Sequence, residues 1–287
     1  MRAAKSLMPP RTGSEAVTLM GRLGYIARGV VYFLVGASAA IAAIWPAHRP
    51  AGPSDAVQLG SAQLDGGQFG GGLLGQGHPI GAIFLIAVAL GLACLAGWFT
   101  IAGLMTAQRG GGRGWWRGLG MLGDAIVYVF FMIDVAGIAL GLWRGGGDRN
   151  VQSWIAWLSA WDYGRPLIGI IGAAVLVGGA GLLVWGIIGN VDREVALPQQ
   201  EKRLIRPVAR YGIAGRGAAV ALVGCFLIAA AFYGNPREAH EVGGMLAALR
   251  HVTYGRVLIG LFGLAFISSS LFDFVAALYR RFDPAEA

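Results

Sequence analysis

Long apolar segments separated by short polar ones set the pattern of this chain. A helix needs roughly 20 consecutive apolar residues to cross the ~30 Å hydrocarbon core of a bilayer. Six segments reach that length, near Tyr25–Trp45, Ile80–Met105, Leu119–Trp143, Leu167–Gly189, Ile213–Tyr233 and Val257–Tyr279. The pattern therefore predicts an all-α bundle of six transmembrane helices.

The first of these segments follows a basic stretch and contains many small residues, as a cleaved secretory signal peptide does. Its apolar run is longer than the ~7–15 residues of a signal peptide's hydrophobic region. It also shares a motif with an internal segment of the chain. We therefore interpret it as a retained transmembrane helix.

The six segments form three tandem pairs. Gly24–Gly36 (GYIARGVVYFLVG) and Gly212–Gly224 (GIAGRGAAVALVG) agree at six of thirteen positions. A second block, YGRPLIG at Tyr163–Gly169, returns as YGRVLIG at Tyr254–Gly260. Each block opens a long apolar run, so the repeat describes how the molecule is built.

Three units follow from these blocks, at residues 19–108, 116–197 and 207–282, after a cytoplasmic N-terminal tail at residues 1–18. The middle unit diverges most, but its Gly120 and Tyr128 stay in register with the glycine and tyrosine of the first unit, Gly24 and Tyr32. Each unit has two spans, so all three have the same orientation, and we predict a pseudo-three-fold arrangement about an axis along the membrane normal. Parallel repeats occur in transporters, and gene triplication without transport also produces them.

The composition excludes a soluble globular domain. Hydrophobic residues make up 56% and charged residues 13% of the chain, whereas soluble domains average about 45–50% and about 25%. Glycine contributes 48 residues, and small residues allow transmembrane helices to approach closely. Two pairs of glycines are spaced seven apart, which keeps each pair near one face of its helix. We predict that these four lie at helix contacts: Gly29 with Gly36, and Gly217 with Gly224.

The distribution of Lys and Arg predicts the orientation. The N-terminus, the second and fourth connections and the C-terminus together hold 14 of them, and the other connections hold 7. Because cytoplasmic loops carry the excess of positive charge, both termini are predicted to be cytoplasmic. The net charge of +8 then reflects topology and contact with anionic lipid headgroups, and we expect no nucleic-acid partner.

The predicted outer connections carry their own pattern. Val151–Trp161 places Trp154, Trp157 and Trp161 on one helical face, and Val242–Leu249 carries apolar residues at matching places. We predict short amphipathic helices at the outer interface, where tryptophan is favoured. Gly60–Gly77 is rich in glycine and contains no phosphate-binding motif, so we interpret it as a weakly ordered loop.

This combination resembles a known family, the bacterial membrane proteins grouped as domain-of-unknown-function family 1206, which are built from three tandem helix pairs. The resemblance rests on the G…ARGVVY…G opening, on the YGR(P/V)LIG blocks and on the triplication, and it extends from Leu19 to Phe282. The middle unit departs from it, with Asp124 where the others have arginine. The resemblance implies the six-helix fold and a place in the bacterial inner membrane, and it implies no activity.

Three charged residues share one position of the repeat inside the predicted spans: Arg28, Asp124 and Arg216. A charge at the centre of a membrane helix costs at least ~2.5–3.5 kcal/mol, so each is a functional candidate. All three lie about one turn into the first helix of a unit. If these helices line the axis, a carboxylate between two guanidiniums would satisfy all three charges. Alternatively, both arginines extend to the cytoplasmic headgroups from a shallow depth.

Two further carboxylates fall in the spans. Asp273 lies two turns from the cytoplasmic end of the last helix and is a second candidate partner for Arg28 or Arg216. Asp134 is the deepest charge, and it is rotated by about 80° around the helix from Asp124, so it need not join the cluster. Asp134 is either an ion or proton site or a hydrogen-bonded structural carboxyl, and we favour the structural interpretation.

Catalytic motifs are absent from the sequence: there is no Ser-His-Asp or Cys-His set, no HExxH and no nucleotide fingerprint. The histidines fall on the predicted outer face without a zinc spacing, and both cysteines fall inside spans as small core residues. These are His48, His78, His240 and His251, with Cys94 and Cys225. We therefore predict no enzyme activity, no cofactor and no metal.

Two functional classes fit these features. The first is a structural or accessory membrane protein that acts through helix packing, with the lipid bilayer and either another membrane protein or a second copy as partners. The second is a transporter or channel for a small solute or ion, with a polar site among the helices. Close-packed glycines at the axis would favour the first class, and a polar cavity there would favour the second.

Overall fold

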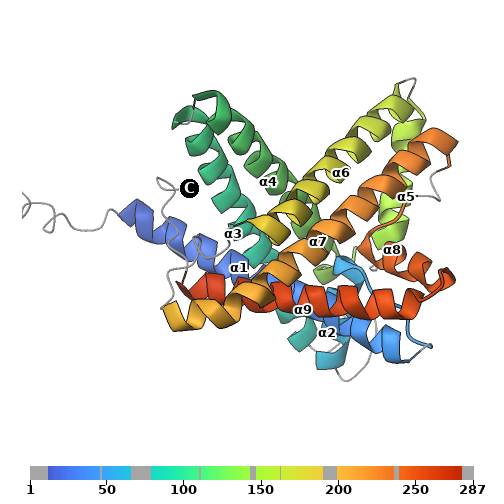
Figure 1. Ribbon diagram of the computed structural model, residues 1–287, viewed down its shortest axis with the longest axis horizontal. Helices are drawn as coiled ribbons and strands as arrows, with labels where there is room; N and C mark the ends of the chain where they lie inside the picture. Colours follow the sequence, from blue (N-terminus) through green and yellow to red (C-terminus); the bar gives the residue numbers. More distant parts are fainter. Residues whose placement is uncertain are drawn as a thin grey trace, which may run out of the picture.

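The computed structural model describes residues 12–45, 47–65, 79–109, 111–142, 147–161, 163–189, 199–235 and 239–279. Over these residues the chain is helical and has no strand. The six long helices are α1 (Thr12–Ile44), α3 (Pro79–Arg109), α4 (Gly111–Ala139), α6 (Gly164–Ile188), α7 (Gln199–Tyr233) and α9 (Gly255–Tyr279) (Figure 1). All six are long and apolar enough to cross a membrane. The predicted all-α fold with six such helices is therefore confirmed, and the chain is a multi-pass membrane protein.

Shorter helices occupy the connections. They are α2 (Pro53–Leu64), α5 (Gly147–Ser159) and α8 (Val242–Ala248), the last continued by a 3₁₀ turn at Leu249–His251. α5 and α8 are the short helices that the sequence predicts there. The rings of Trp154, Trp157 and Trp161 are exposed and meet edge to face, with successive centroids 5.9 and 5.1 Å apart. An exposed aromatic face of this kind suits the membrane–water interface.

The helix α2 corrects one prediction, because Gly60 belongs to a helix and not to a weakly ordered loop. Pro53 takes the first helical position, where its fixed φ favours the helix. Ala56 and Val57 bury their side chains against the rest of the protein. This burial outweighs the low helix propensity of Gly60. The rest of the glycine-rich segment, residues 66–78, lies outside the described residues.

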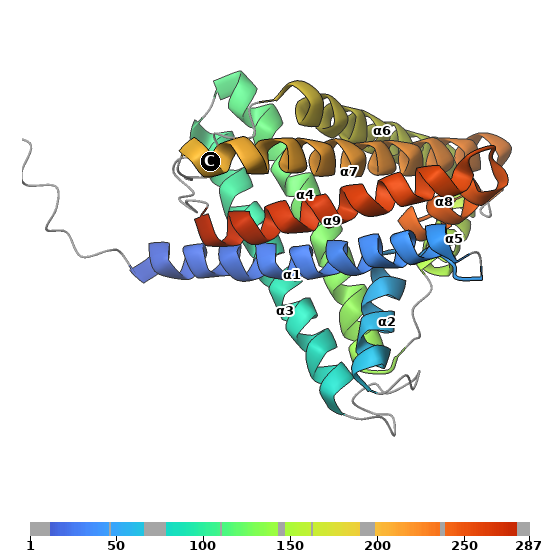
Figure 2. The ribbon, with the colours of Figure 1, turned by 60° about the horizontal axis from the view of Figure 1, so that its bottom comes forward.

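The most extensive helix packing joins different repeat units. α3 packs against α4, α6 against α7, and α9 against α1; we call these three contacts the seams. Figures 1 and 2 both show α1 beside α9 and α6 beside α7. Each seam joins the second helix of one unit to the first helix of another, and the α9–α1 seam connects the last unit back to the first. The helix pair that repeats in the sequence is therefore not the pair that packs most closely.

In two of the seams, glycines at matching positions of the repeat make the contact. A Cβ added at Gly36 would lie 2.8 Å from the carbonyl oxygen of Gly263, and one at Gly224 would lie 2.9 Å from that of Gly172. Gly263 and Gly172 each lie nine residues after the tyrosine of their YGR block. Distances this short leave no room for a side chain, so the α1–α9 and α6–α7 backbones are in direct contact.

The other two glycines of the predicted set also lie at seams. A Cβ at Gly29 would lie 2.9 Å from the Phe274 ring, and one at Gly217 would lie 2.8 Å from the carbonyl oxygen of Gly179. The α3–α4 seam has a different centre, because Met132 stands where the other units have Gly36 and Gly224. The pseudo-three-fold arrangement and the unit boundaries thus stay predictions, favoured by two matching seams.

The YGR blocks form the turns that lead into α6 and α9. A Cβ at Gly164 or Gly255 would collide with a carbonyl oxygen of the preceding turn, that of Leu158 or Leu249 respectively. Arg256 then donates from Nε and Nη2 to the Ala43 carbonyl oxygen, at 3.1 and 2.9 Å, and from Nη2 to that of Ile44 at 2.8 Å. These carbonyls end α1, where a cation is favoured. The block therefore combines a tight turn with a cap on the neighbouring helix.

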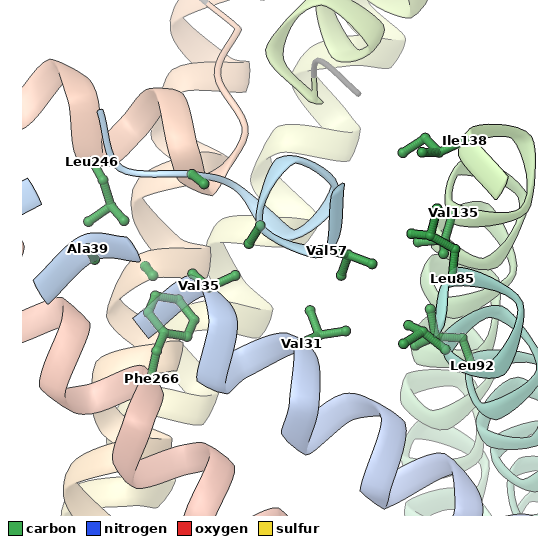
Figure 3. Close-up of a cluster of buried hydrophobic side chains, with 14 of the residues drawn as sticks. Val31, Val35, Ala39, Val57, Leu85, Leu92, Val135, Ile138, Leu246 and Phe266 are labelled. Atoms are coloured by element: carbon green, nitrogen blue, oxygen red, sulfur yellow. The ribbon is translucent and has the colours of Figure 1, made fainter. Parts of the chain in front are cut away.

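The main hydrophobic core contains residues of α1, α3 and α4. Figure 3 shows Val31 of α1 and Val57 of α2 on the side toward Leu85 and Leu92 of α3, with Val135 of α4 beside Leu85. Side chains of α2, α8 and α9 close the remaining sides. This packing fixes α1 against α3 and so positions Arg28, which lies one turn before Val31 on α1.

Candidate functional site

The centre of the candidate site is a buried ion pair. Arg28 of α1 donates from Nε to Asp273 Oδ2 at 2.9 Å and from Nη2 to Asp273 Oδ1 at 2.5 Å. The two residues are 6% and 0% exposed. Two parallel hydrogen bonds between a guanidinium and a carboxylate make the strongest geometry for such a pair. The pair forms because α9 is the seam partner of α1.

Tyrosines complete the surroundings of Arg28. Its Nη1 donates to the Tyr128 hydroxyl oxygen at 3.3 Å, and its guanidinium carbon lies 4.3 Å from the centroid of the Tyr25 ring. The Tyr128 ring in turn stacks on Phe99 of α3, with centroids 5.6 Å apart. A cation over an aromatic face gains further electrostatic stabilisation. The Arg28 side chain therefore ties together α1, α4 and α9.

Arg216 of α7 lies in the same region. Its guanidinium carbon lies 5.4 Å from the centroid of the Tyr32 ring. Its charge interacts with those of Asp273 and Arg28. No ion pair within 4.0 Å is found for Arg216 among the residues that the structure describes. The charges of the central pair therefore act on Arg216, but Arg216 makes no ion pair with the Asp273 carboxylate.

Asp124 of α4 lies at the edge of this group. Its charge interacts with those of Arg216 and Arg28. Its side chain is nevertheless exposed, and within the described part of the chain it makes no ion pair shorter than 4.0 Å. The structure thus brings Arg28, Arg216 and Asp273 together and leaves Asp124 beside them. The carboxylate in contact with a guanidinium is Asp273, because the closest packing of α1 is with α9 and not with α4.

The positions of the two arginines within their helices differ from the sequence prediction. α1 begins at Thr12 and α7 at Gln199, well before the apolar runs on which the prediction was based. Arg28 and Arg216 therefore lie roughly four turns into their helices, near the middle, and not one turn from the end. α7 runs through Pro207 without a break. Arg28, which is buried, pairs its charge with Asp273 inside the bundle.

Asp134 is not part of this cluster. Its Oδ1 accepts a hydrogen bond of 2.9 Å from Asn150 Nδ2, and its side chain is partly buried. Asn150 belongs to α5, so this bond holds the tryptophan-bearing helix against α4. This hydrogen bond is of the kind that the structural interpretation expects, and the role of Asp134 stays a prediction.

The remaining candidates are scattered. His240 contacts the Phe226 ring at 5.1 Å between centroids, while His78 lies outside the described residues. Cys94 and Cys225 are free thiols. Over the described ranges, no three His, Cys, Asp or Glu side chains are grouped so that they could hold a metal ion.

Sequence reasoning missed the tyrosines around the arginines. A signal for them was present, because Tyr25 and Tyr32 lie three residues before and four residues after Arg28, and such positions share a helix face. Tyr32 and Tyr128 also share a position of the repeat. The tyrosines at helical spacing around Arg28 were therefore an available signal for the site.

Comparisons with known proteins agree with the sequence resemblance. The family described as Domain of Unknown Function (DUF1206) matches residues 211–280. The chain is also 25% identical over 266 residues to the uncharacterized protein YxxB of Bacillus subtilis (strain 168), covering 91% of this chain and 90% of that protein. No solved structure matches the chain. The predicted resemblance is therefore confirmed, and neither match names an activity.

Proposed function

We propose that this chain is a structural or accessory protein of the bacterial cell membrane, with both termini in the cytoplasm, that acts through helix packing. One observation carries the proposal: the hydrogen bonds of the buried Arg28–Asp273 pair are made within the protein. Charges already paired in this way hold helices together and need no ligand. The backbone contacts at Gly36 and Gly224 support the same role.

Replacing the pair tests this role. Removing one partner of a buried pair leaves a stranded charge, whereas replacing both by apolar residues is often neutral or stabilising. Arg28→Leu and Asp273→Leu should each lower the yield of folded protein in detergent, and the double variant should recover most of it. Chemical cross-linking in membranes should link the double variant to the same proteins as the parent. A double variant that folds well but is no longer linked to those proteins would contradict a purely structural role for the pair.

Reporter fusions test the proposed orientation. Fusions after Ala285 and within residues 49–76 should give opposite readouts, with the C-terminal reporter in the cytoplasm. The proposal follows from the excess of Lys and Arg in the connections assigned to the cytoplasm. A C-terminus on the outer side would reverse the assignment of every connection.

A transporter or channel for a small solute or ion is the second candidate, and Asp124 is the observation that favours it. This exposed carboxylate lies within a membrane-crossing helix, in the field of Arg216, where charges commonly mark ion or proton pathways. Proteoliposomes with internal pH-, Na⁺- or K⁺-sensitive dyes provide the test. A flux that Asp124→Asn abolishes without changing the melting temperature would replace the structural proposal with this one. Fluxes equal to those of protein-free vesicles would support the structural role.

A further inference from the structure

The first and second helices of the outer two units pack through small residues one turn apart. In the third unit, a Cβ added at Gly212 would collide with the backbone nitrogen of Ser269, and one at Gly215 with the Ala265 side chain. In the first unit, a Cβ at Gly24 would lie 2.6 Å from Leu95 Cβ. α7 therefore lies directly against α9, and α1 against α3.

The middle unit carries the same residues without the contact. Gly120 is in register with Gly24 and Gly212, and Gly123 lies three residues later, as Gly215 does after Gly212. A Cβ added at Gly120 or at Gly123 would meet no atom within 4 Å. This face of α4 is therefore free where the equivalent faces of α1 and α7 are covered.

The matching face of α6 is free as well. Gly178 and Ser269 both lie fifteen residues after the tyrosine of their YGR block, so Gly178 occupies the position that contacts α7 in the third unit. A Cβ at Gly178 would meet no atom within 4 Å. Ala174, the counterpart of Ala265, is exposed. Two faces that pack together in the other units are thus both uncovered in this one.

The helices that carry these faces are apart. α4 and α6 make no contact comparable with α1–α3 or α7–α9 over the described residues. Figure 1 shows the α3–α4 pair and the α6–α7 pair diverging from each other. The middle unit is therefore open between its two helices, while the first and third units are closed.

Asp124 lies on the uncovered face of α4. It follows Gly123 and is four residues after Gly120, so all three share one side of the helix. A carboxylate exposed within a membrane-crossing helix is unfavourable, and its interaction with Arg216 is longer than an ion pair. Covering this face would bring Asp124 into the central group, which would then hold two guanidiniums and two carboxylates.

We infer that α4 and α6 form a lateral gate, described here in its open state, which closes when the Gly120–Gly123 face of α4 meets the Ala174–Gly178 face of α6. The other two units supply the geometry of the closed state. The positions that must meet are glycine or alanine in the middle unit, so these positions leave room for close approach. Opening the gate exposes Asp124 to the interior of the bilayer, and closing it encloses Asp124 beside Arg216.

Cysteine cross-linking in membranes tests the gate. In a chain with Cys94 and Cys225 replaced by alanine, Gly120→Cys and Gly178→Cys should form a disulfide within one chain under mild oxidant. A disulfide needs Cβ atoms roughly 3.5–4.5 Å apart, which the open state does not provide. The control pair is Gly120→Cys with Val177→Cys. Val177 lies at the same level of α6 as Gly178 but on a different face, so this pair should form much less disulfide. Mass spectrometry of the linked peptides separates links within a chain from links between chains.

A blocking substitution supplies the second readout. Gly120→Leu should abolish the disulfide of the pair Gly123→Cys with Ala174→Cys while leaving the folded yield unchanged, because Gly120 has no neighbour in the open state. The matched variant Gly212→Leu should lower the folded yield, since that contact is already made. Links only between chains would assign the two faces to a second copy, and no link at all would show that they stay apart; either result overturns the gate.

Discussion

The α6–α7 seam and the open side of the middle unit lie on two sides of the same helix and show opposite uses of glycine. At the seam, Gly172 meets the α7 backbone, with Ile228 N 2.9 Å from its added Cβ. On the open side, a Cβ at Gly178 or Gly181 would meet nothing within 4 Å. A glycine in a membrane helix therefore permits close approach but does not by itself produce it. Contact depends on which helix the rest of the fold places opposite.

The charged residues show the same contrast. Asp273 lies within the closed part of the bundle, fully buried and bonded to Arg28. Asp124 lies on the open side, exposed and without an ion pair within 4.0 Å among the described residues. Two carboxylates in membrane helices of one protein thus have different surroundings, and variants of each should behave differently.

The largest effect is expected at Asp273. Asp273→Asn removes the charge that pairs with buried Arg28, and breaking a buried pair typically costs ~3–5 kcal/mol. Asp124→Asn removes no such pair and should lower the melting temperature much less. Thermal melts of the two purified variants in one detergent provide the comparison. Equal losses would show that Asp124 is enclosed in solution and that the open arrangement is rare.

Glycine replacement at a seam should have the next largest effect. Gly224→Leu places a side chain where the Leu176 backbone nitrogen is 2.5 Å from the added Cβ, and overpacking of this kind typically costs ~1–3 kcal/mol or more. Gly36→Leu should behave similarly at the α1–α9 seam. Size-exclusion profiles in detergent report the folded yield of each variant. Parent-like profiles for both would mean that these glycines face lipid.

The Arg256 cap on the end of α1 should contribute less to stability than the seam glycines. Arg256→Ala removes three hydrogen bonds to the Ala43 and Ile44 carbonyls. A cation near a helix C-terminus contributes ~0.3–1 kcal/mol at an exposed position, so the melting temperature should fall slightly. Arg256→Lys is the control, because it keeps the charge without the fork of donors. A drop as large as that of Asp273→Asn would show that Arg256 has a further partner.

The smallest effect, and one of opposite sign, is expected on the open side. Gly181→Ala adds a methyl group where no atom lies within 4 Å. Alanine favours a helix over glycine by roughly 0.5–1 kcal/mol, so the variant should melt at the same temperature as the parent or slightly higher. A clear loss of stability would mean that another helix covers this face in the membrane.

Much of the fold follows from local pattern. Each of the six apolar runs has the length of one transmembrane helix, so the number and approximate positions of the helices could be predicted. Helix ends were less predictable, because α1 and α7 extend far beyond their apolar runs. In α7 the added residues Gln199–Arg203 are good helix formers. α2 was missed because its helicity depends on burial of Ala56 and Val57.

The charged residues of the candidate site could be predicted from the sequence, but which of them form an ion pair could not. Each of Arg28, Asp124, Arg216 and Asp273 stands out in the sequence, because a charge within an apolar run is costly whatever surrounds it. Which carboxylate meets which guanidinium depends on helix neighbours that are distant in the chain. Arg28 and Asp273 are 245 residues apart in sequence, and no local pattern relates them.

The sequence by itself determined that this is an all-helical membrane protein with a repeated plan, because helix length, polarity and glycine spacing are local properties that the bilayer constrains directly. The tertiary structure alone decided which repeats pack. It placed α9 against α1, paired Arg28 with Asp273, and left the middle unit open although its glycines match those of the closed units. These outcomes depend on the simultaneous packing of all six helices, and identical local residues can be covered in one unit and free in another.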